Sequence, residues 1–291
     1  MAGTVPPQRS RPPRPQQRKR KWKPPVEEGA ATKPTGETPA GDKAARKRQK
    51  KKRNATDADD GDMDFDLSIN RAVARMDSNL LANYVARQTL RFGKDLSPVE
   101  LADLTLDAKP ILDTSSYDKD RTVDNLPHFL ETFCDGGQKH LSQASKDKGA
   151  PHTIIVTGAG IRAVDLVRAV RSFQTANSTV SKLFAKHIKL AEAVSFLQSH
   201  RTGIAVGTPA RLIDLLDSGA LSLTHLKRIV VDASHIDQKK RGVLDMQDTA
   251  LPVVRWLARP ELRARYGGNE EDTPTDSKDD KAAQPLSILF Y

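Results

Sequence analysis

Apolar and polar residues alternate in blocks from residue 153 onward, and these blocks predict strands separated by helices. Short apolar runs predict strands, whereas apolar residues spaced three or four apart predict helices. The predicted strands are 153–157, 180–184, 203–207 and 228–232, and the predicted helices are 161–173, 188–199 and 209–217. Strands joined through helices of this length favour a parallel sheet with helices on both faces. The pattern therefore predicts an α/β fold with a mostly parallel sheet.

The flanking segments predict further elements of the same domain. Apolar residues at helical spacing predict an amphipathic helix over 67–92. Ser97, Pro98 and Glu100 predict the start of another helix, because these residue types suit its N-cap, N1 and N3 positions. The other predictions are a short helix at 126–133, a helix at 243–266, a polar loop at 267–285 and a strand at 286–291 that completes the sheet. We expect a single folded domain over residues 67–291.

Predicted strand ends and helix starts carry residues that suit phosphate or metal binding. Asp232 follows the apolar run 229–231, and open α/β sheets bind ligands at the carboxyl ends of their strands. An aspartate in this position holds Mg²⁺ in P-loop NTPases. Thr208 and Arg211 lie at the start of the helix 209–217, and Arg162 lies at the start of the helix 161–173. Helix N-termini and arginines both bind phosphate, although each of these residues also suits a purely structural role.

The rest of a P-loop motor is missing from the sequence. Asp232 is followed by Ala-Ser-His, so no carboxylate is next to it to activate water. Gly93-Lys94 is the only Gly-Lys pair; it precedes Asp95 and has no glycine upstream at the spacing of a phosphate-binding loop. We therefore expect no ATP hydrolysis and no bound cofactor.

Several of these segments resemble the first lobe of DEAD-box RNA helicases. Thr-Pro-Ala-Arg at 208–211 is similar to their T-P-G-R motif, and Asp-Ala-Ser-His at 232–235 is similar to D-E-A-D, with His235 in the last position. The strand and helix at 154–170 resemble those of the P-T-R-E-L motif, with Arg162 at its arginine and Ile161 in place of its threonine. The chain resembles more narrowly the U3-containing 90S pre-ribosomal complex subunit family, through residues 181–197 and 203–242.

That resemblance implies a fold and a cellular role. The fold is a single RecA-like lobe of the P-loop-NTPase type with a degenerate Walker B motif. The implied role is a non-catalytic factor of the nucleus and nucleolus that acts in small-subunit ribosome assembly and pre-rRNA processing, with pre-rRNA or other RNA and ribosome-assembly proteins as partners. Lys186 and His187, at a strand-to-helix turn, are further candidates for contact with RNA or protein, and a capping or packing role is open for His187.

Residues 1–66 differ from the rest in charge. Residues 1–53 hold 17 basic and 4 acidic residues, a net charge of +13, and residues 54–66 hold 6 acidic and no basic residues. Dense like charge with few apolar residues predicts disorder over 1–66. The basic residues form two clusters, which suit RNA or a nuclear import receptor. The cluster residues are Arg18, Lys19, Arg20, Lys21, Lys23, Arg46, Lys47, Arg48, Lys50, Lys51, Lys52 and Arg53.

Other functions have weaker support. No apolar run is long enough to span a membrane, Cys134 is the single cysteine, and no two histidines have the i, i+4 spacing of a helical metal site. The turn at 157–160 resembles a dinucleotide-binding turn that lacks its third glycine, so a reductase or a methyltransferase is an alternative function. A reductase of this kind requires a lysine four residues after its tyrosine, but Tyr117 is followed at that spacing by Arg121. His235 and Asp237 could serve acid–base chemistry. The main alternative is an RNA helicase or ATPase that takes its P-loop from a partner.

Overall fold

A computed structural model describes residues 62–186, 188–267 and 285–291. Both basic clusters, His187 and nearly all of the polar segment 267–285 lie outside the described residues. The last residues of the predicted tail, 62–66, lie within them and include strand β1 (Met63–Asp64), which pairs in antiparallel fashion with β2 (Ile69–Asn70).

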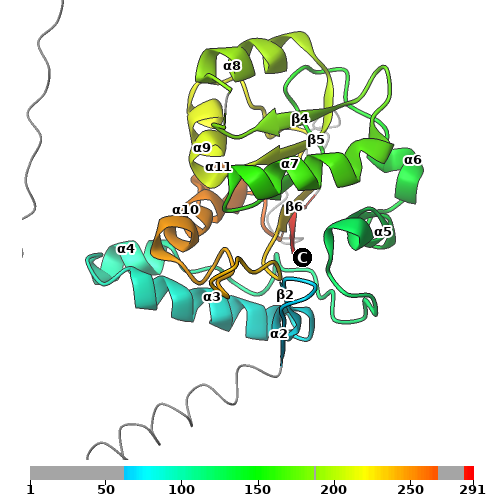
Figure 1. The fold of residues 1–291 in the computed structure, drawn as a ribbon. Helices are drawn as coiled ribbons and strands as arrows, with labels where there is room; N and C mark the ends of the chain where they lie inside the picture. Colours follow the sequence, from blue (N-terminus) through cyan, green and yellow to red (C-terminus); the bar gives the residue numbers. More distant parts are fainter. Residues whose placement is uncertain (1–61, 187, 268–284) are drawn as a thin grey trace, which may run out of the picture. The chain divides into compact units, whose positions relative to one another are not determined.

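A five-stranded parallel sheet forms the centre of the domain (Figure 1). Its order is β4-β5-β3-β6-β7, and every neighbouring pair is parallel. The bounds are β3 (Thr153–Val156), β4 (Thr179–Leu183), β5 (Thr202–Gly207), β6 (Arg228–Val231) and β7 (Ser287–Phe290). The α/β class, the parallel sheet and the strand at the end of the chain are thereby confirmed.

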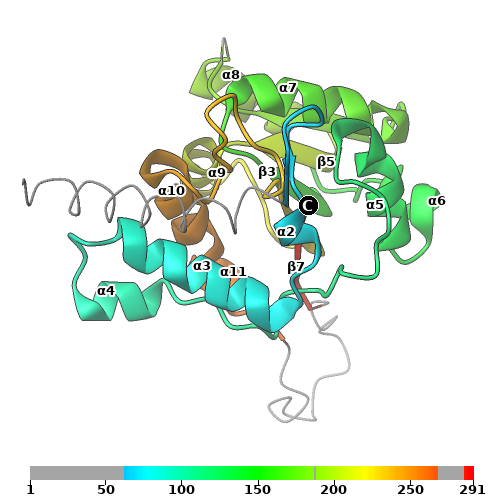
Figure 2. The same ribbon diagram turned by 60° about the horizontal axis from the view of Figure 1, so that its bottom comes forward.

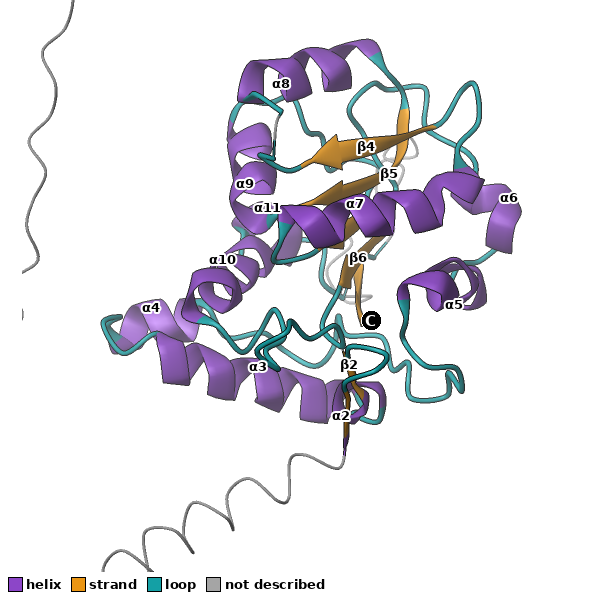
Figure 3. Cartoon of the chain, viewed as in Figure 1, coloured by secondary structure: helices purple, strands orange, loops and turns teal. Residues whose placement is uncertain are grey.

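Helices cover both faces of this sheet, and alternate strand residues explain how. Successive side chains of a strand point to opposite faces, so Ile154 belongs to one hydrophobic cluster and Ile155 to the other. The first cluster packs against α3 (Ser78–Phe92), α8 (Leu190–Ser199), α9 (Pro209–Asp217) and α10 (Gln247–Leu257). The second packs against α5 (Leu126–Thr132) and α7 (Gly160–Ala169). Figure 2 shows α7 and α3 on opposite sides, and Figure 3 shows the strands between the helices.

Two long predicted helices are interrupted. The predicted helix 67–92 consists of β2, α2 (Arg71–Ala74) and α3, because Asn70 and Asp77 each cap a separate helix start. The Asp77 carboxylate accepts a hydrogen bond from the Leu80 N–H at 2.8 Å, which fixes the start of α3. The predicted helix 243–266 consists of α10 and α11 (Pro260–Arg263), since Pro260 starts a new helix.

The remaining helices follow their local sequence signals. In α4 (Pro98–Asp103), Ser97 and Glu100 form the expected capping box: the Ser97 N–H donates to the Glu100 carboxylate at 2.7 Å, and the Glu100 N–H donates to the Ser97 hydroxyl at 3.3 Å. After α7 the chain continues as a 3₁₀ turn, η3 (Val170–Phe173). The other short elements are η2 (Val123–Asn125) and α6 (Gly137–Leu141).

Gly207 ends β5 where two strands approach closely, and this predicts the effect of adding a side chain. A Cβ at this position would lie 2.6 Å from the Leu183 carbonyl oxygen and 2.8 Å from a Leu212 methyl group. We expect Gly207→Ala to lower the free energy of unfolding by about 1–3 kcal/mol through overpacking. Denaturant unfolding measures this change. Ala210→Ser, at an exposed position in α9, is the control and should stay within about 0.5 kcal/mol of the wild type.

Candidate functional site

Three polar residues lie side by side at the carboxyl edge of the sheet. Thr157, Thr208 and Asp232 directly follow β3, β5 and β6. The Asp232 N–H donates to the Val156 carbonyl at 2.9 Å, and the Thr157 N–H donates to the Gly207 carbonyl at 3.1 Å. The register of the parallel strands therefore brings Asp232 to the position that the sequence predicts, at the end of a buried strand.

Side chains from within the chain occupy the carboxylate of Asp232. Arg162, in the first turn of α7, donates from Nε to Oδ2 at 2.9 Å and from Nη2 to Oδ1 at 2.8 Å. The Thr157 hydroxyl donates to Oδ2 at 2.9 Å. The Asp232 side chain is 1% exposed and the Arg162 side chain 10%. Burial alone would lower the pKa of Arg162, but the charge and hydrogen bonds of Asp232 outweigh it and raise that pKa.

This arrangement opposes metal binding at Asp232. Mg²⁺ needs accessible carboxylate oxygens and keeps several of its waters, whereas both oxygens of Asp232 accept hydrogen bonds from groups in the interior. A guanidinium in direct contact would also repel a cation. Among the residues that the structure describes, no group of three or more His, Cys, Asp or Glu side chains could hold a metal ion.

The other candidate residues of the sequence lie around this edge in different settings. Arg211 is 9% exposed and donates from Nη1 to the Ile188 carbonyl at 3.1 Å, which ties α9 to the loop after β4. Thr208 is the N-cap of α9 but makes no side-chain cap bond. Lys186 is exposed, and its side chain lies close to Gly160. For Arg162 and Arg211 the geometry favours the structural role over phosphate contact.

The segment after Asp232 is held on two sides by the chain itself. The N–H groups of Ala233 and Ser234 donate to the Tyr291 carbonyl at 2.6 and 2.7 Å. On the other side, the Asn70 N–H donates to the Ser234 carbonyl at 2.7 Å, and Ile69 forms an antiparallel bridge with His235. Burial, and then the charge of Arg162, lower the pKa of His235. The hairpin β1–β2 thus packs against the residues that resemble D-E-A-D.

A loop without glycine leads from Ile111, which lies outside the named strands, toward helix α5. Ile111 forms a parallel bridge with Ile288, and η2 and α5 follow the loop. A phosphate-binding loop also leads into a helix, but it relies on glycines and a lysine. Here the loop 113–121 contains three aspartates and no glycine. Carboxylates repel phosphate, so this connection does not form a phosphate cradle.

Arg121, at the end of this loop, is a buried residue whose role the sequence did not reveal. It is 1% exposed and donates to the Phe290 carbonyl, and to the carbonyl and hydroxyl of Thr114 at 3.1 and 2.9 Å. Burial lowers the pKa of Arg121 to about 10. The carbonyls that it binds, those of Thr114, Ala74 and Phe290, are 7, 47 and 169 residues away along the chain. The sequence shows only a basic residue in a turn and does not reveal these partners.

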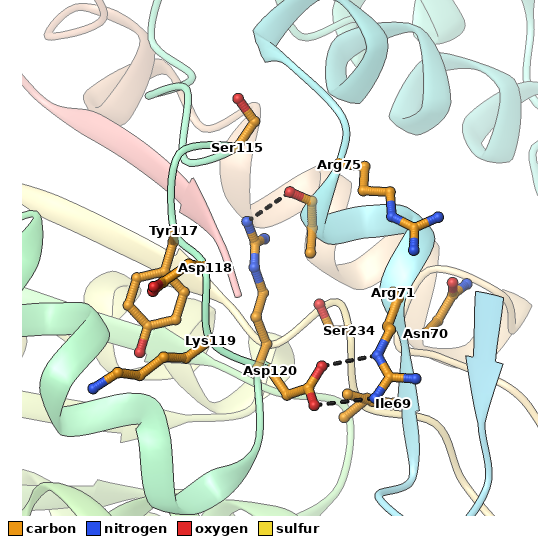
Figure 4. A pocket seen from close by; sticks show the side chains of 12 residues that line it. Ile69, Asn70, Arg71, Arg75, Ser115, Tyr117, Asp118, Lys119, Asp120 and Ser234 are labelled. Atoms are coloured by element: carbon orange, nitrogen blue, oxygen red, sulfur yellow. Dashed lines mark hydrogen bonds and ion pairs between the residues drawn. The ribbon is translucent and has the colours of Figure 1, made fainter.

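A cavity of about 210 Å³ lies between this loop and the N-terminal hairpin (Figure 4). Asp120 on the loop accepts hydrogen bonds from Arg71 of α2 at 2.8 and 3.0 Å, and Ser234 lies beside this pair (Figure 4). The hydrogen bond to Arg71 lowers the pKa of Asp120. The ion pair joins the hairpin side of the cavity to the loop side, so the two walls support each other.

The turn at 157–160 is packed against the chain rather than open to a dinucleotide. A Cβ on Gly158 would lie 2.9 Å from the methyl group of Thr249 in α10 and 3.1 Å from Val243. A pyrophosphate would have to displace these side chains.

The Tyr117 hydroxyl donates to the Asn125 carbonyl at 3.1 Å, and burial raises the pKa of Tyr117 to about 12. These contacts favour the structural reading of the turn and of Tyr117.

Arg162→Met tests the buried ion pair. Removing one partner leaves the carboxylate of Asp232 buried without its counter-charge, so we expect the free energy of unfolding to fall by about 3–5 kcal/mol. RNA affinity should not change. The matched control is Arg168→Met on the same helix, where an exposed pair with Asp165 should contribute less than about 1 kcal/mol. A stable Arg162→Met protein that binds RNA more weakly would instead identify a phosphate contact.

The sequence is similar to one family of known proteins over most of its length. The family described as "CMS1: U3-containing 90S pre-ribosomal complex subunit" matches residues 25–273. Protein CMS1 of Chaetomium thermophilum is 53% identical over 250 residues, which are 86% of this chain and 94% of that protein. Protein cms1 of Schizosaccharomyces pombe is 32% identical over 62% of this chain and 61% of its own length. Protein CMSS1 of Homo sapiens is 32% identical over 46% of this chain and 47% of its own length.

Solved structures with similarity to this chain include two DEAD-box proteins. A DEAD box protein from Methanococcus jannaschii has a TM-score of 0.37 at 18% identity, over 59% of this chain and 37% of its own. The yeast DEAD-box splicing factor Prp28 has a TM-score of 0.36 at 17% identity, over 54% of this chain and 34% of its own.

Because the family match extends over most of the sequence, this chain belongs to the CMS1 family of U3-containing 90S pre-ribosomal complex subunits.

Proposed function

We propose that this protein acts in the 90S pre-ribosome as a non-catalytic factor that binds RNA and assembly proteins. The hydrogen bonding and burial of the Asp232 side chain support this proposal. Both carboxylate oxygens accept hydrogen bonds from Arg162, one of them also accepts from Thr157, and the side chain is 1% exposed. A nucleotide-dependent motor needs this carboxylate to hold Mg²⁺. A P-loop supplied by a partner would not release the carboxylate from Arg162.

The proposed contacts with partners come from two parts of the chain. The basic clusters between Arg18 and Arg53 would bind phosphates of pre-rRNA or an import receptor, because their charge is dense and uncompensated. The folded lobe would dock onto ribosome-assembly proteins. Family membership supports a site of action in the nucleus and nucleolus. In the part of the chain that the structure describes, no helix is long and apolar enough to cross a membrane.

We expect the full-length protein to show no ATP hydrolysis above background, with or without single-stranded RNA. The carboxylate at the Mg²⁺ position is engaged, and the loop 113–121 offers no phosphate cradle. A sensitive phosphate-release assay measures the turnover. The matched control is Asp232→Ala, which should show the same background rate. RNA-stimulated turnover that Asp232→Ala abolishes would establish the competing function, an RNA-dependent ATPase.

Deletion of residues 1–53 should remove most of the salt-sensitive RNA binding and the nuclear accumulation. This segment holds a net charge of +13, whereas residues 67–291 hold 30 basic and 27 acidic residues. The slope of log K against log[salt] should therefore fall toward zero, since each lost phosphate contact removes about 0.7 from the slope for single strands. The melting temperature of the domain should not change. An unaltered slope in the shortened protein would place the phosphate contacts on the lobe instead.

A further inference from the structure

A second cavity lies at the amino-terminal end of the sheet, opposite the edge that carries Asp232. Its volume is about 720 Å³, within the range of small-molecule sites. His152 precedes β3, Arg228 begins β6 and Ser287 begins β7, and all three line the cavity. The loop after α5 and the loop after α6 provide the other walls. No candidate residue proposed from the sequence lies here.

Arg228 is the main charged group in this cavity. It is 9% exposed, and its Nη1 donates to the Thr153 hydroxyl at 3.3 Å. Within residues 62–186, 188–267 and 285–291, no carboxylate forms an ion pair with it. Arg162, which is buried to the same degree, has Asp232 as its counter-charge. A buried guanidinium without a carboxylate is costly, and an anionic ligand in the cavity would offset that cost.

The charges around Arg228 add to the positive potential. Lys227 is exposed and also lines the cavity. Burial, then the neighbouring charge of Arg228 and, to a smaller extent, that of Lys227 lower the pKa of His152 to about 4. Asp135 is the one carboxylate among the lining residues and is exposed at the rim. Arg228 is therefore the buried cation among the residues named here, and Lys227 adds a second, exposed one.

The walls of the cavity are fixed and partly apolar. Arg201 donates to the Ser145 and Ala144 carbonyls, both at 2.7 Å, and so holds the loop after α6 in place. Phe133 is partly exposed, and its ring packs against Phe129 with centroids 4.9 Å apart. A held aromatic ring in a cavity that is also lined by Arg228 and Lys227 suits a nucleobase that stacks while its phosphate meets the two cations.

We propose that this cavity binds one nucleotide of a single-stranded RNA, with the phosphate on Arg228 and Lys227 and the base against Phe133. The site rests on the proposed RNA-binding function and goes beyond it, because it gives the lobe an RNA contact separate from the basic clusters. An acidic peptide would satisfy the cations as well. The aromatic ring of Phe133 in its wall favours a nucleotide.

Photocrosslinking of the full-length protein to single-stranded RNA that carries 4-thiouridine tests this site. Crosslinked peptides are then mapped by mass spectrometry. We expect crosslinks in the peptides that contain Phe133 and Lys227. In Lys227→Glu these crosslinks should fall about tenfold, which corresponds to about 1.4 kcal/mol. Arg228→Gln should have the same effect, with the melting temperature recorded to show that the domain is folded.

The matched control is Lys182→Glu, an exposed lysine in β4 at the far side of the sheet, which should leave the crosslinks unchanged. Crosslinks at the basic clusters serve as an internal reference. If they form while the cavity peptides stay unlabelled, the cavity proposal is wrong and the proposed function stands. If no peptide is labelled anywhere, RNA binding itself is contradicted. A third outcome is that the wild type shows no RNA crosslinks at the cavity and Lys227→Glu no longer binds an assembly protein. That result would identify a docking site for an acidic protein and would overturn the proposed nucleotide site.

Discussion

The buried ion pair between Arg162 and Asp232 determines how the carboxyl edge of this sheet is built. Two opposite charges removed from water are tolerated only when geometry and hydrogen bonding compensate for their lost hydration. Here the pair is bidentate, and the Thr157 hydroxyl provides a third hydrogen bond. The pair joins the first turn of α7 to the end of β6 across β3. It therefore fixes the edge at which an α/β sheet ordinarily binds its ligand.

The segments around this pair follow from the same constraint. Because Asp232 points into the interior, the residues after it are free to form hydrogen bonds with other parts of the chain. Ser234 is bonded through its backbone to Tyr291 on one side and to Asn70 on the other. The ion pair between Arg71 and Asp120 then joins the hairpin side to the loop 113–121. Internal contacts thus occupy the Asp232 carboxylate at the carboxyl edge, whereas the cavity beside Arg228 lies at the opposite end of the sheet.

Much of the fold could be predicted from the sequence, because its signals are local. Apolar runs located β3, β5 and β6, and the glycine and proline around Thr208 located the start of α9. The predicted helix 67–92 runs through Asn70 and Asp77, because the helical spacing of apolar residues continues across both. In the structure, the side chains of Asn70 and Asp77 cap two separate helices. Residue type alone does not show whether such a side chain caps a helix or faces solvent.

The site itself depended on contacts that the sequence does not reveal. Arg162 and Asp232 are 70 residues apart, and they meet because β3 and β6 are neighbours in register. An arginine in the first turn of a helix suits a phosphate and a carboxylate equally well, so its partner could not be chosen beforehand. The cavity around Arg228 combines separate loops and strand starts, and none of its residues forms a motif along the chain.

A double-mutant cycle on Arg162 and Asp232 measures how strongly the two buried side chains interact. The free energies of unfolding of the wild type, Arg162→Met, Asp232→Asn and the double variant would be measured by denaturant titration. If the two side chains form the pair described, the coupling energy should be about 1.5–3 kcal/mol, and the double variant should be more stable than the sum of the single changes predicts. A coupling energy below about 0.5 kcal/mol would show that Asp232 does not interact with Arg162, and would contradict the buried ion pair.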